Sequence, residues 1–317
     1  MNHAPYVLTF GETMALMSAT QAGPLAHAST LRLGIGGSES NMAIGLQRLG
    51  VQAVWCGRVG ADSLGELVTR EIRAEGVDVR SIIDEAAPTG LMVKERRTPD
   101  LQRVSYYRSG SAGSRISPDD LDRDLIRNAA LLHVTGITPA LSAGAAAVLF
   151  EAIATAKAAQ VPVSFDLNYR SKLWSQDDAG AVYREIIPLV DIVFAGIDEA
   201  EIAVGTSPSA EELARRLSQL GPRQAVIKLG AEGALALIDG DVYRQNAVPV
   251  AVVDTVGAGD AFVAGYLAEF VNQALPEARL KTAAATGAFA CLVPGDWEGF
   301  PRREELSLLL ASEPVLR

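Results

Sequence analysis

Residues 254–265, DTVGAGDAFVAG, place two aspartates and three glycines directly before a segment with helical spacing of apolar residues. Backbone N–H groups in such a glycine turn can form an anion-binding concavity, and the following helix adds the positive end of its dipole. The pattern predicts a phosphate site at a helix N-terminus, with the carboxylate of Asp260 at its mouth. A tight turn with Asp260 as the helix N-cap explains the same residues equally well.

Other nucleotide motifs fit this stretch poorly. No GK[ST] follows the glycines, so it is not a P-loop of the Walker A type. Spaced glycines also occur in dinucleotide-binding folds, but here they fall late in the chain and no acidic residue closes a following strand at the expected distance. A dinucleotide-dependent oxidoreductase is therefore a distant alternative.

A second glycine-rich turn leads into a helical pattern at residues 34–50, GIGGSESNMAIGLQRLG. Its polar residues mix hydrogen-bond donors and acceptors at one helix start, as hydroxyl-rich ligands such as sugars require. Alone, the stretch is equally well read as another strand-to-helix loop. The candidate ligand-binding residues here are Gly36, Gly37, Ser38, Glu39 and Asn41.

Short β-rich runs alternate with helical patterns through most of the chain. This alternation is typical of βαβ units around a parallel sheet, in which ligands bind beyond the carboxyl ends of the strands. Strands are expected at 6–11, 51–60, 131–136, 161–168, 191–196, 224–230 and 233–240, and helices at 40–50, 63–76, 141–159, 177–188, 198–205, 209–221 and 261–270.

Two segments break the alternation. Residues 13–33 have no helical period, and residues 88–108 contain two strand-like runs joined by the turn-prone Thr98, Pro99 and Asp100. Together they predict a small sheet that lies across the main domain as a lid.

The composition limits which ligands the protein is expected to bind and where in the cell it is expected to be. The 317 residues are 49% hydrophobic, with a net charge of −10, so nonspecific nucleic-acid binding is not expected, and an anionic ligand needs locally placed arginines or lysines. Two distant cysteines and the absence of a signal-peptide pattern favour a cytoplasmic protein. The apolar segment 141–159 carries Glu151 and Lys157, which favours a globular helix over a membrane span.

Over nearly its whole length, the chain resembles the ribokinase-type (PfkB) carbohydrate kinases. The resemblance rests on GGSESNMAIGLQRLG (36–50), VGADSLGE (59–66), VIKLGAEGAL (226–235) and DTVGAGDAFVAGYL (254–267). It implies one domain over residues 1–317 with a ribokinase-like three-layer α/β/α fold. The central sheet is then mostly parallel, and a small β-sheet lid is formed by residues 12–33 and 88–109.

The resemblance implies ATP-dependent phosphorylation of a sugar hydroxyl. Asp260 is then the general base, and the N–H groups of Gly257, Ala258 and Gly259 hold the charge that develops on the phosphate. Mg²⁺ is held mainly by phosphates and water. The nucleotide side is implied to include Asn168, Lys228, Gly230, Gly233, Gly257 and Gly259, although Lys228 can also be read as a solvated strand-end lysine.

The chain departs from the family pattern at two positions. Glu199 is present in the NxxE element, but Gly196 stands in place of the asparagine, so Glu199 is expected to act on the metal only indirectly. Met92 occupies a lid position where relatives often have a tyrosine. Asp254 is interpreted as loop structure. The resemblance leaves open a monovalent cation requirement and a homodimer formed through the lid.

Within the family, three stretches look most like 2-keto-3-deoxygluconate kinases: YYRSGSAGS (106–114), FDLNYRSKLW (165–174) and PGDWEGFP (294–301). Arg108 and Arg170 could pair with the substrate carboxylate. Glu12, Tyr106 and Asp296 complete the expected substrate site. The expected product is 2-keto-3-deoxy-6-phosphogluconate.

Three alternatives remain at this point. Arg108 could be an exposed lid residue, and Arg170 a salt-bridge partner at a strand end. The enzyme could be a fructokinase or a ribokinase-like kinase for a neutral sugar. A catalytically silent sugar-binding protein with the same fold is disfavoured by the presence of Asp260.

Overall fold

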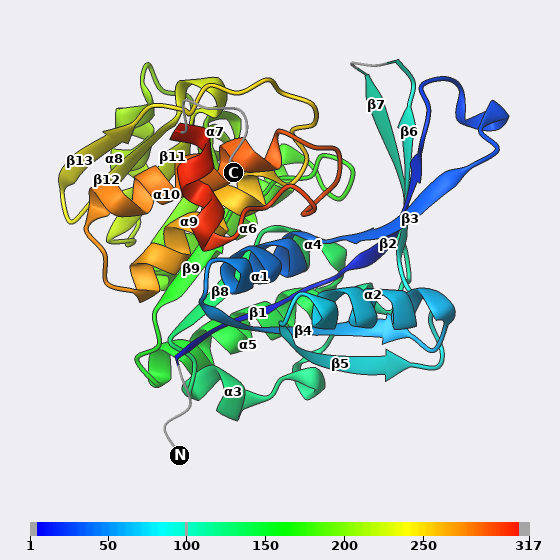
Figure 1. Cartoon of the computed structure of the whole chain (residues 1–317). Coiled ribbons are helices and arrows are strands. Elements are labelled where there is room, and N and C mark those ends of the chain that lie inside the picture. Colours follow the sequence, from blue (N-terminus) through cyan, green and yellow to red (C-terminus); the bar gives the residue numbers. More distant parts are fainter. Residues whose placement is uncertain (1–4, 99–100, 311–317) are drawn as a thin grey trace.

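The central sheet has the strand order β13-β12-β11-β10-β9-β8-β1-β4-β5 (Figure 1). It is parallel from β11 to β5, whereas β12 and β13 are antiparallel to their neighbours. Strands such as β8 and β9 are buried along their entire length, because helices cover both faces of a parallel sheet. The predicted, mostly parallel sheet is confirmed.

This computed structural model describes residues 5–98 and 101–310, so the predicted turn at 98–100 lies mostly outside the described residues. The strands are β1 (Tyr6–Phe10), β2 (Met14–Ala19), β3 (Leu31–Gly36), β4 (Gln52–Gly60), β5 (Asp78–Asp84), β6 (Leu91–Arg96), β7 (Gln102–Tyr107), β8 (Leu131–Thr135), β9 (Val163–Asp166), β10 (Ile192–Gly196), β11 (Gln224–Lys228), β12 (Ala234–Ile238) and β13 (Asp241–Gln245). The α-helices are α1 (Ser38–Arg48), α2 (Ser63–Ala74), α3 (Arg123–Arg127), α4 (Ile137–Leu141), α5 (Ala143–Ala158), α6 (Gln176–Ile186), α7 (Ile197–Val204), α8 (Ala210–Gln219), α9 (Ala258–Val271) and α10 (Pro276–Ala290).

Two hydrophobic cores separate the helices into layers. Helices α1, α2, α9 and α10 pack on one face of the sheet, and α3, α5, α6, α7 and α8 pack on the other. Helix α9 belongs to the buried interior, because nine consecutive residues from Asp260 to Ala268 are buried. The three-layer α/β/α architecture predicted from the sequence is confirmed. None of the described helices is long and apolar enough to cross a membrane.

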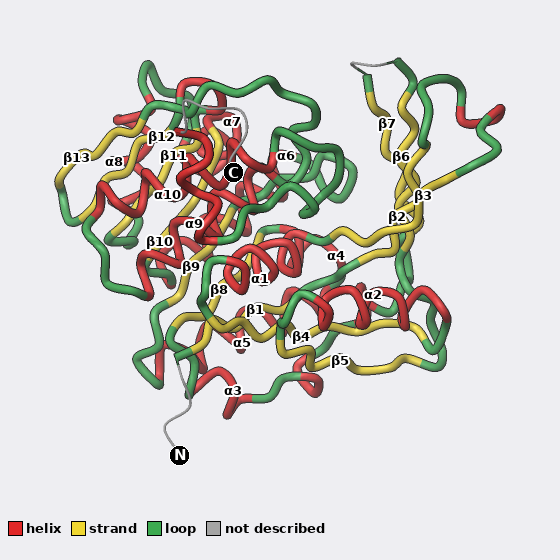
Figure 2. Tube along the Cα trace, in the orientation of Figure 1, coloured by secondary structure: helices red, strands yellow, loops and turns green. Residues whose placement is uncertain are grey.

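A four-stranded sheet in the order β3-β2-β6-β7 forms the lid. It extends outward from one side of the main body (Figures 1 and 2). The face of β6 directed at the main domain carries alternate buried residues, Met92 and Lys94, whereas Leu91 and Val93 are only half-buried. The lid therefore presents one specific face of β6 to the candidate site.

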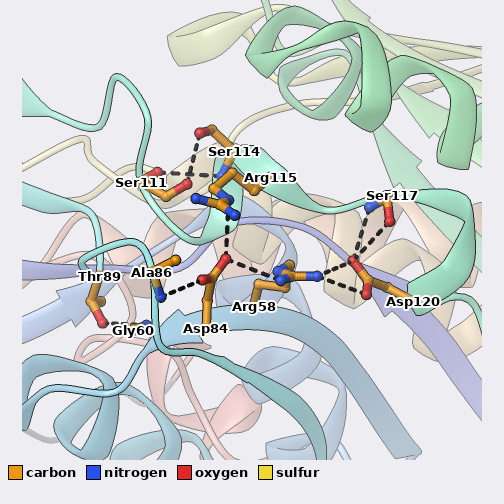
Figure 3. A network of polar contacts seen from close by, with 10 residues as sticks. All are labelled: Arg58, Gly60, Asp84, Ala86, Thr89, Ser111, Ser114, Arg115, Ser117 and Asp120. Atoms are coloured by element: carbon orange, nitrogen blue, oxygen red, sulfur yellow. Dashed lines mark hydrogen bonds and ion pairs between the residues drawn. The ribbon is translucent and has the colours of Figure 1, made fainter.

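A polar network fixes the base of the lid (Figure 3). Arg58 on β4 bonds both Asp84 at the end of β5, at 3.0 Å, and Asp120, at 2.8 and 2.9 Å. Arg115 adds a second guanidinium to Asp84 at 3.1 Å. The network joins the segment that follows β7 to the ends of β4 and β5. The other residues drawn in Figure 3 are Gly60, Ala86, Thr89, Ser111, Ser114 and Ser117.

Candidate active site

Four strands of the central sheet deliver polar residues to one edge. Asn168 follows β9, Glu199 follows β10, Lys228 ends β11 and Glu12 follows β1. These strands are parallel in the sheet, so their carboxyl ends lie along the same edge. Helix α9 brings Asp260 to this edge from a distant part of the chain.

Hydrogen bonds hold both carboxylate oxygens of Asp260. Ser38 Oγ donates to Oδ1 at 2.6 Å, and Asn41 Nδ2 donates to Oδ2 at 2.8 Å. Asn168 Nδ2 in turn donates to Ser38 Oγ at 2.6 Å. Asn168 has a φ of 40°, a left-handed conformation that asparagine tolerates better than most residues. The carboxylate is thus fixed by α1 and by the residues after β9.

Burial raises the pKa of Asp260, against the opposing effect of the hydrogen bonds from Ser38 and Asn41 and of the positive charges on Arg170 and Lys228. The carboxyl is only 9% exposed, yet it lines a cavity. A buried carboxylate with a raised pKa is a stronger base than an exposed one, so this geometry suits the acceptance of a proton from a bound hydroxyl.

Gly257 begins α9 as its N-cap, with a φ of 75°. A Cβ at this position would collide with the backbone oxygen of Asp296, so no other residue fits. Gly257 and Gly259 line the same cavity as Asp260, whereas Ala258 lines a neighbouring one. The Ala258 N–H donates back to Thr255 O at 3.3 Å. The structure therefore brings the two glycines, but not Ala258, to the Asp260 cavity.

The Asp260 cavity has a volume of about 710 Å³ and lies between the lid and the strand ends. Lid residues and main-domain residues share its wall, which is the arrangement of a site that a lid covers. Its polar and charged lining comprises Lys94, Tyr106, Asp166, Asn168, Arg170, Asp198, Glu199, Lys228, Thr255, Asp260 and Asp296.

The two predicted arginines differ in their surroundings. Arg108 is nearly buried and pairs with Glu12 Oε2 at 2.6 Å. Arg170 is exposed and lines both the Asp260 cavity and an adjoining cavity of about 1010 Å³, which Arg108 also lines. Its guanidinium donates to Tyr169 O, and among the described residues it has no ion-pair partner. Arg170 is thus available to an anionic ligand.

Glu12 and Glu39 do not line either cavity. Glu12 is 2% exposed and accepts hydrogen bonds from Arg108 and Ser111, so it orients Arg108 from behind. Glu39 is enclosed in the interior, where Thr135 and Thr138 donate to its Oε1, and burial raises its pKa to about 7. The structure therefore places both residues outside the expected contact with a ligand.

Gly36 and Gly37 precede α1 and line neither the Asp260 cavity nor the adjoining one. A Cβ at Gly36 would overlap Asp296 Oδ2, and one at Gly37 would lie 2.6 Å from Glu12 O. These glycines permit the close approach of their neighbours. Gly36 in particular leaves the space that the Asp296 carboxylate occupies.

Lys228 is a paired residue, not a solvated one. Its Nζ donates to both oxygens of Asp166, at 2.7 and 2.9 Å, and lies 3.9 Å from Glu199 Oε2. Glu199 accepts from the backbone N–H groups of Tyr169 and Gly196, so it caps α7 and fixes the loop after β9. Each Glu199 oxygen thereby accepts one backbone hydrogen bond.

A third cavity, of about 540 Å³, adjoins the Asp260 cavity and shares Lys228, Thr255 and Gly259 with it. Its wall is mostly apolar, with contributions from Val248, Phe262 and α10. It also contains the predicted nucleotide-loop glycines, Gly230 and Gly233. A flat aromatic base fits such an apolar slot next to an anion-binding loop.

Three charged residues of the Asp260 cavity were not predicted from the sequence: Lys94, Asp166 and Asp198. Asp166 ends β9 two residues before Asn168, and Lys94 lies two residues after Met92 on the same face of β6. The period of two along a strand would have indicated that Lys94 shares the cavity face with Met92. The pairing of Asp166 with Lys228 joins β9 to β11 across β10, and only the sheet order reveals it.

Residues 4–303 match the family model of the pfkB family carbohydrate kinases. The chain belongs to this family. Its catalytic class is therefore that of a sugar kinase, and the predicted ribokinase-like resemblance is confirmed.

Several pfkB relatives are similar over nearly their whole length. A 2-dehydro-3-deoxygluconokinase of Bacillus subtilis is 36% identical over 96% of this chain and 95% of its own. One of Thermoproteus tenax is also 36% identical, over 96% and 94%. A 2-dehydro-3-deoxygalactonokinase of Haloferax volcanii is 35% identical, over 92% of each chain.

Solved structures agree with this fold. A PfkB protein from Polaromonas sp. JS666 superposes with a TM-score of 0.88 at 34% identity, covering 96% of this chain and 99% of its own. A fructokinase from Xylella fastidiosa with bound ATP gives a TM-score of 0.84 at 26% identity, covering 96% and 98%. The resemblance thus extends over the lid as well as the main domain.

Proposed function

We propose that this kinase transfers the γ-phosphoryl group of ATP to the terminal hydroxyl of 2-keto-3-deoxygluconate, giving 2-keto-3-deoxy-6-phosphogluconate. The observation that carries the choice of a sugar acid is Arg170, a guanidinium free for a ligand in the same cavity as Asp260. The names of the relatives from Bacillus subtilis and Thermoproteus tenax support the same substrate.

In this account Asp260 accepts the proton of the attacking hydroxyl. Ser38 and Asn41 hold the carboxylate in place, so no rearrangement is needed when the sugar binds. Gly257 and Gly259 face the transferred phosphoryl group with backbone N–H groups at the start of α9. Positioning and charge stabilisation thus carry the reaction, as is usual for phosphoryl transfer.

The sugar acid spans the Asp260 cavity, with its carboxylate towards Arg170 and its terminal hydroxyl towards Asp260. Arg108 and Tyr106 close this end from the lid, and the Arg108 guanidinium lies 5.8 Å from the centre of the Tyr106 ring. Asp296 accepts a hydrogen bond from a sugar hydroxyl. Met92 offers no such bond where relatives often have a tyrosine.

ATP places its base in the apolar cavity between Gly233 and α10, and its phosphates towards Lys228 and the start of α9. The described residues contain no cluster of three or more carboxylate, histidine or cysteine ligands for a metal. Nucleotide phosphates and water would hold Mg²⁺, in keeping with the usual preference of this ion. A monovalent cation and a cytoplasmic location stay predictions.

A homodimer through the lid is a further part of the proposal. Leu31, Leu33 and Tyr107 are exposed on the lid strands, at 37%, 50% and 65%. Their burial against a second lid would remove apolar surface from water. Light scattering on the purified chain measures this state directly: a dimer mass supports the proposal and a monomer mass contradicts it.

Replacement of Arg170 by alanine tests the sugar-acid assignment. We expect kcat/KM for 2-keto-3-deoxygluconate to fall by about 10- to 100-fold, since charge-assisted hydrogen bonds to a carboxylate are lost. Any residual activity towards fructose should change by less than about threefold. Steady-state kinetics with both sugars measure the difference. Arg103→Ala, on the exposed lid strand β7, is the matched control.

An equal loss on the neutral and the acidic sugar in Arg170→Ala would contradict this assignment. It would favour the alternative of a fructokinase or ribokinase-like enzyme. Arg170→Lys keeps the charge but not the fork of donors, and should retain part of the selectivity.

Filling the apolar cavity tests where the nucleotide base binds. A Cβ at Gly287 on α10 would lie 3.4 Å from Ala258 O and 3.7 Å from Phe262 Cβ, which is ordinary contact. Gly287→Val should therefore fold, and its methyl groups should raise the KM for ATP at least about tenfold. Calorimetry should show unchanged sugar binding, with Gly287→Ala as the control. An unchanged KM for ATP would place the base elsewhere.

A further inference from the structure

Lys94 is a charged lid residue whose partners lie outside the lid. It is 7% exposed, and its Nζ donates to Asp254 Oδ2 at 2.8 Å. Asp254 starts the glycine loop that leads to α9, and it also accepts from the backbone N–H groups of Val256 and Gly295. This ion pair therefore joins β6 of the lid directly to the loop that carries the anion-binding glycines.

The same ammonium group faces a second carboxylate. Lys94 Nζ lies 3.9 Å from Asp296 Oδ1, and both side chains line the Asp260 cavity. Asp296 itself packs against the backbone of Gly36, where a Cβ would overlap its Oδ2. The backbone oxygen of Asp296 lies so close to Gly257 that a Cβ added there would collide with it. Asp296 thus lies where the lid, the glycine loop and the start of α1 meet.

We propose that Lys94 is a positioning residue that ties strand β6 to the glycine loop and keeps the Asp296 carboxylate ionised as a hydrogen-bond acceptor for the sugar. This inference rests on the proposed function, since it assigns the role of a residue in the same site. It gives a task to the one cationic side chain that the lid strand β6 directs into the Asp260 cavity.

The charges around Asp296 explain why it needs Lys94. Burial raises the pKa of Asp296 to about 7, against the opposing charge of Lys94. Part of this increase comes from the charges of three carboxylates: Glu298 on the same loop, Asp260 on α9 and Asp254 before α9. Two arginines face this loop: Arg32 on β3 pairs with Glu298, and Arg48 on α1 donates to backbone oxygens of residues 297, 298 and 300.

The direction of the pH effect follows from these charges. The ionised Asp296 carboxylate can accept a sugar hydroxyl on either oxygen, whereas protonation removes its negative charge and turns one oxygen into a donor. Sugar binding is therefore strongest above the pKa of Asp296 and weakens as the pH falls through it. Loss of the Lys94 charge raises that pKa, because an opposite charge at this distance typically lowers a carboxyl pKa by about 1 to 3 units. Loss of the Asp254 charge lowers the pKa of Asp296. Asp296 is then the remaining carboxylate partner of Lys94 among the ion pairs of the described residues.

The test measures 2-keto-3-deoxygluconate binding by calorimetry and kcat/KM between pH 5.5 and 9 for wild type, Lys94→Met, Asp254→Asn and Lys94→Arg. We expect the acid limb of both profiles to move up by about one unit in Lys94→Met. In Asp254→Asn it should move down, because the Asp254 charge raises the pKa of Asp296. Lys94→Arg should restore the wild-type profile. Thermal unfolding of each variant shows that it is folded.

A purely structural clamp predicts a different result. Lys94→Met and Asp254→Asn would then weaken binding equally at every pH, and neither acid limb would move, which would overturn the proposal. If Lys94→Met does not fold, Asp254→Asn still decides, because a downward shift of its acid limb supports the charge argument and an unmoved or upward-shifted limb contradicts it. Failure of the wild type to phosphorylate 2-keto-3-deoxygluconate would instead defeat the proposed function, and the variants would be measured with the sugar that it does accept.

Discussion

Asp260→Asn is expected to lower kcat by about 10²- to 10⁴-fold, the range that a positioned general base contributes. The amide keeps the shape of the carboxylate but cannot accept the hydroxyl proton. Ser38 and Asn41 donate to the two carboxylate oxygens, so one of these bonds is lost in the variant. The KM for the sugar should change only severalfold. Steady-state kinetics at saturating ATP measure both constants.

Asp241→Asn is the matched control, because Asp241 begins β13 on an exposed part of the surface. It should leave kcat unchanged. If Asp260→Asn turned over substrate as fast as the wild type, Asp260 would not be the general base.

Gly257→Ala is expected to lower kcat/KM more than about 10²-fold, because loss of a single oxyanion donor has an effect of this size. Two physical causes act together. The φ of 75° is strained for alanine, and the added Cβ would collide with Asp296 O. The loop must then shift, which displaces both the phosphate-facing N–H groups and Asp296. The kcat reports the displacement of the phosphate-facing N–H groups, and calorimetry of sugar binding reports the displacement of Asp296.

Gly50→Ala separates strain from collision. Gly50 follows α1 with a φ of 81°, but no neighbouring atom lies within 4 Å of an added Cβ. It carries the same backbone strain without the contact, so it should lower stability slightly and leave kcat/KM unchanged. Equal losses in both variants would mean that the strain, and not the fit of the loop against Asp296, causes the effect.

The fold was predictable because its signals are local. Short β-rich runs, such as those at 131–136 and 191–196, indicated strands of a parallel sheet, and the helical patterns between such runs indicated the crossovers. Asp260 and its glycines lie within one short stretch, so their joint role was also readable. The antiparallel strand β13 and helix α10 were not predicted. Helix α10 is rich in alanine, and its alanines are not confined to one side. No sharp apolar stripe therefore marks this helix in the sequence.

The partners of the site residues were less predictable, because sequence patterns do not show which side chains meet. Glu12 and Glu39 were expected to contact ligand, yet both are buried behind the site, where they hold Arg108 and two threonines. Asp254 was interpreted as loop structure, and the structure adds its pairing with Lys94 from a strand 160 residues away. Such contacts depend on how the lid docks on the main domain.

Turnover of 2-keto-3-deoxygluconate with ATP and Mg²⁺, with the phosphate position determined by NMR of the product, tests the central claim most directly. Fructose and the galactonate epimer, named for the Haloferax volcanii relative, are the comparison substrates. We expect phosphate on the terminal hydroxyl and a kcat/KM for 2-keto-3-deoxygluconate at least about tenfold above that for fructose. No turnover, phosphate on another hydroxyl, or an equal preference for fructose would contradict it.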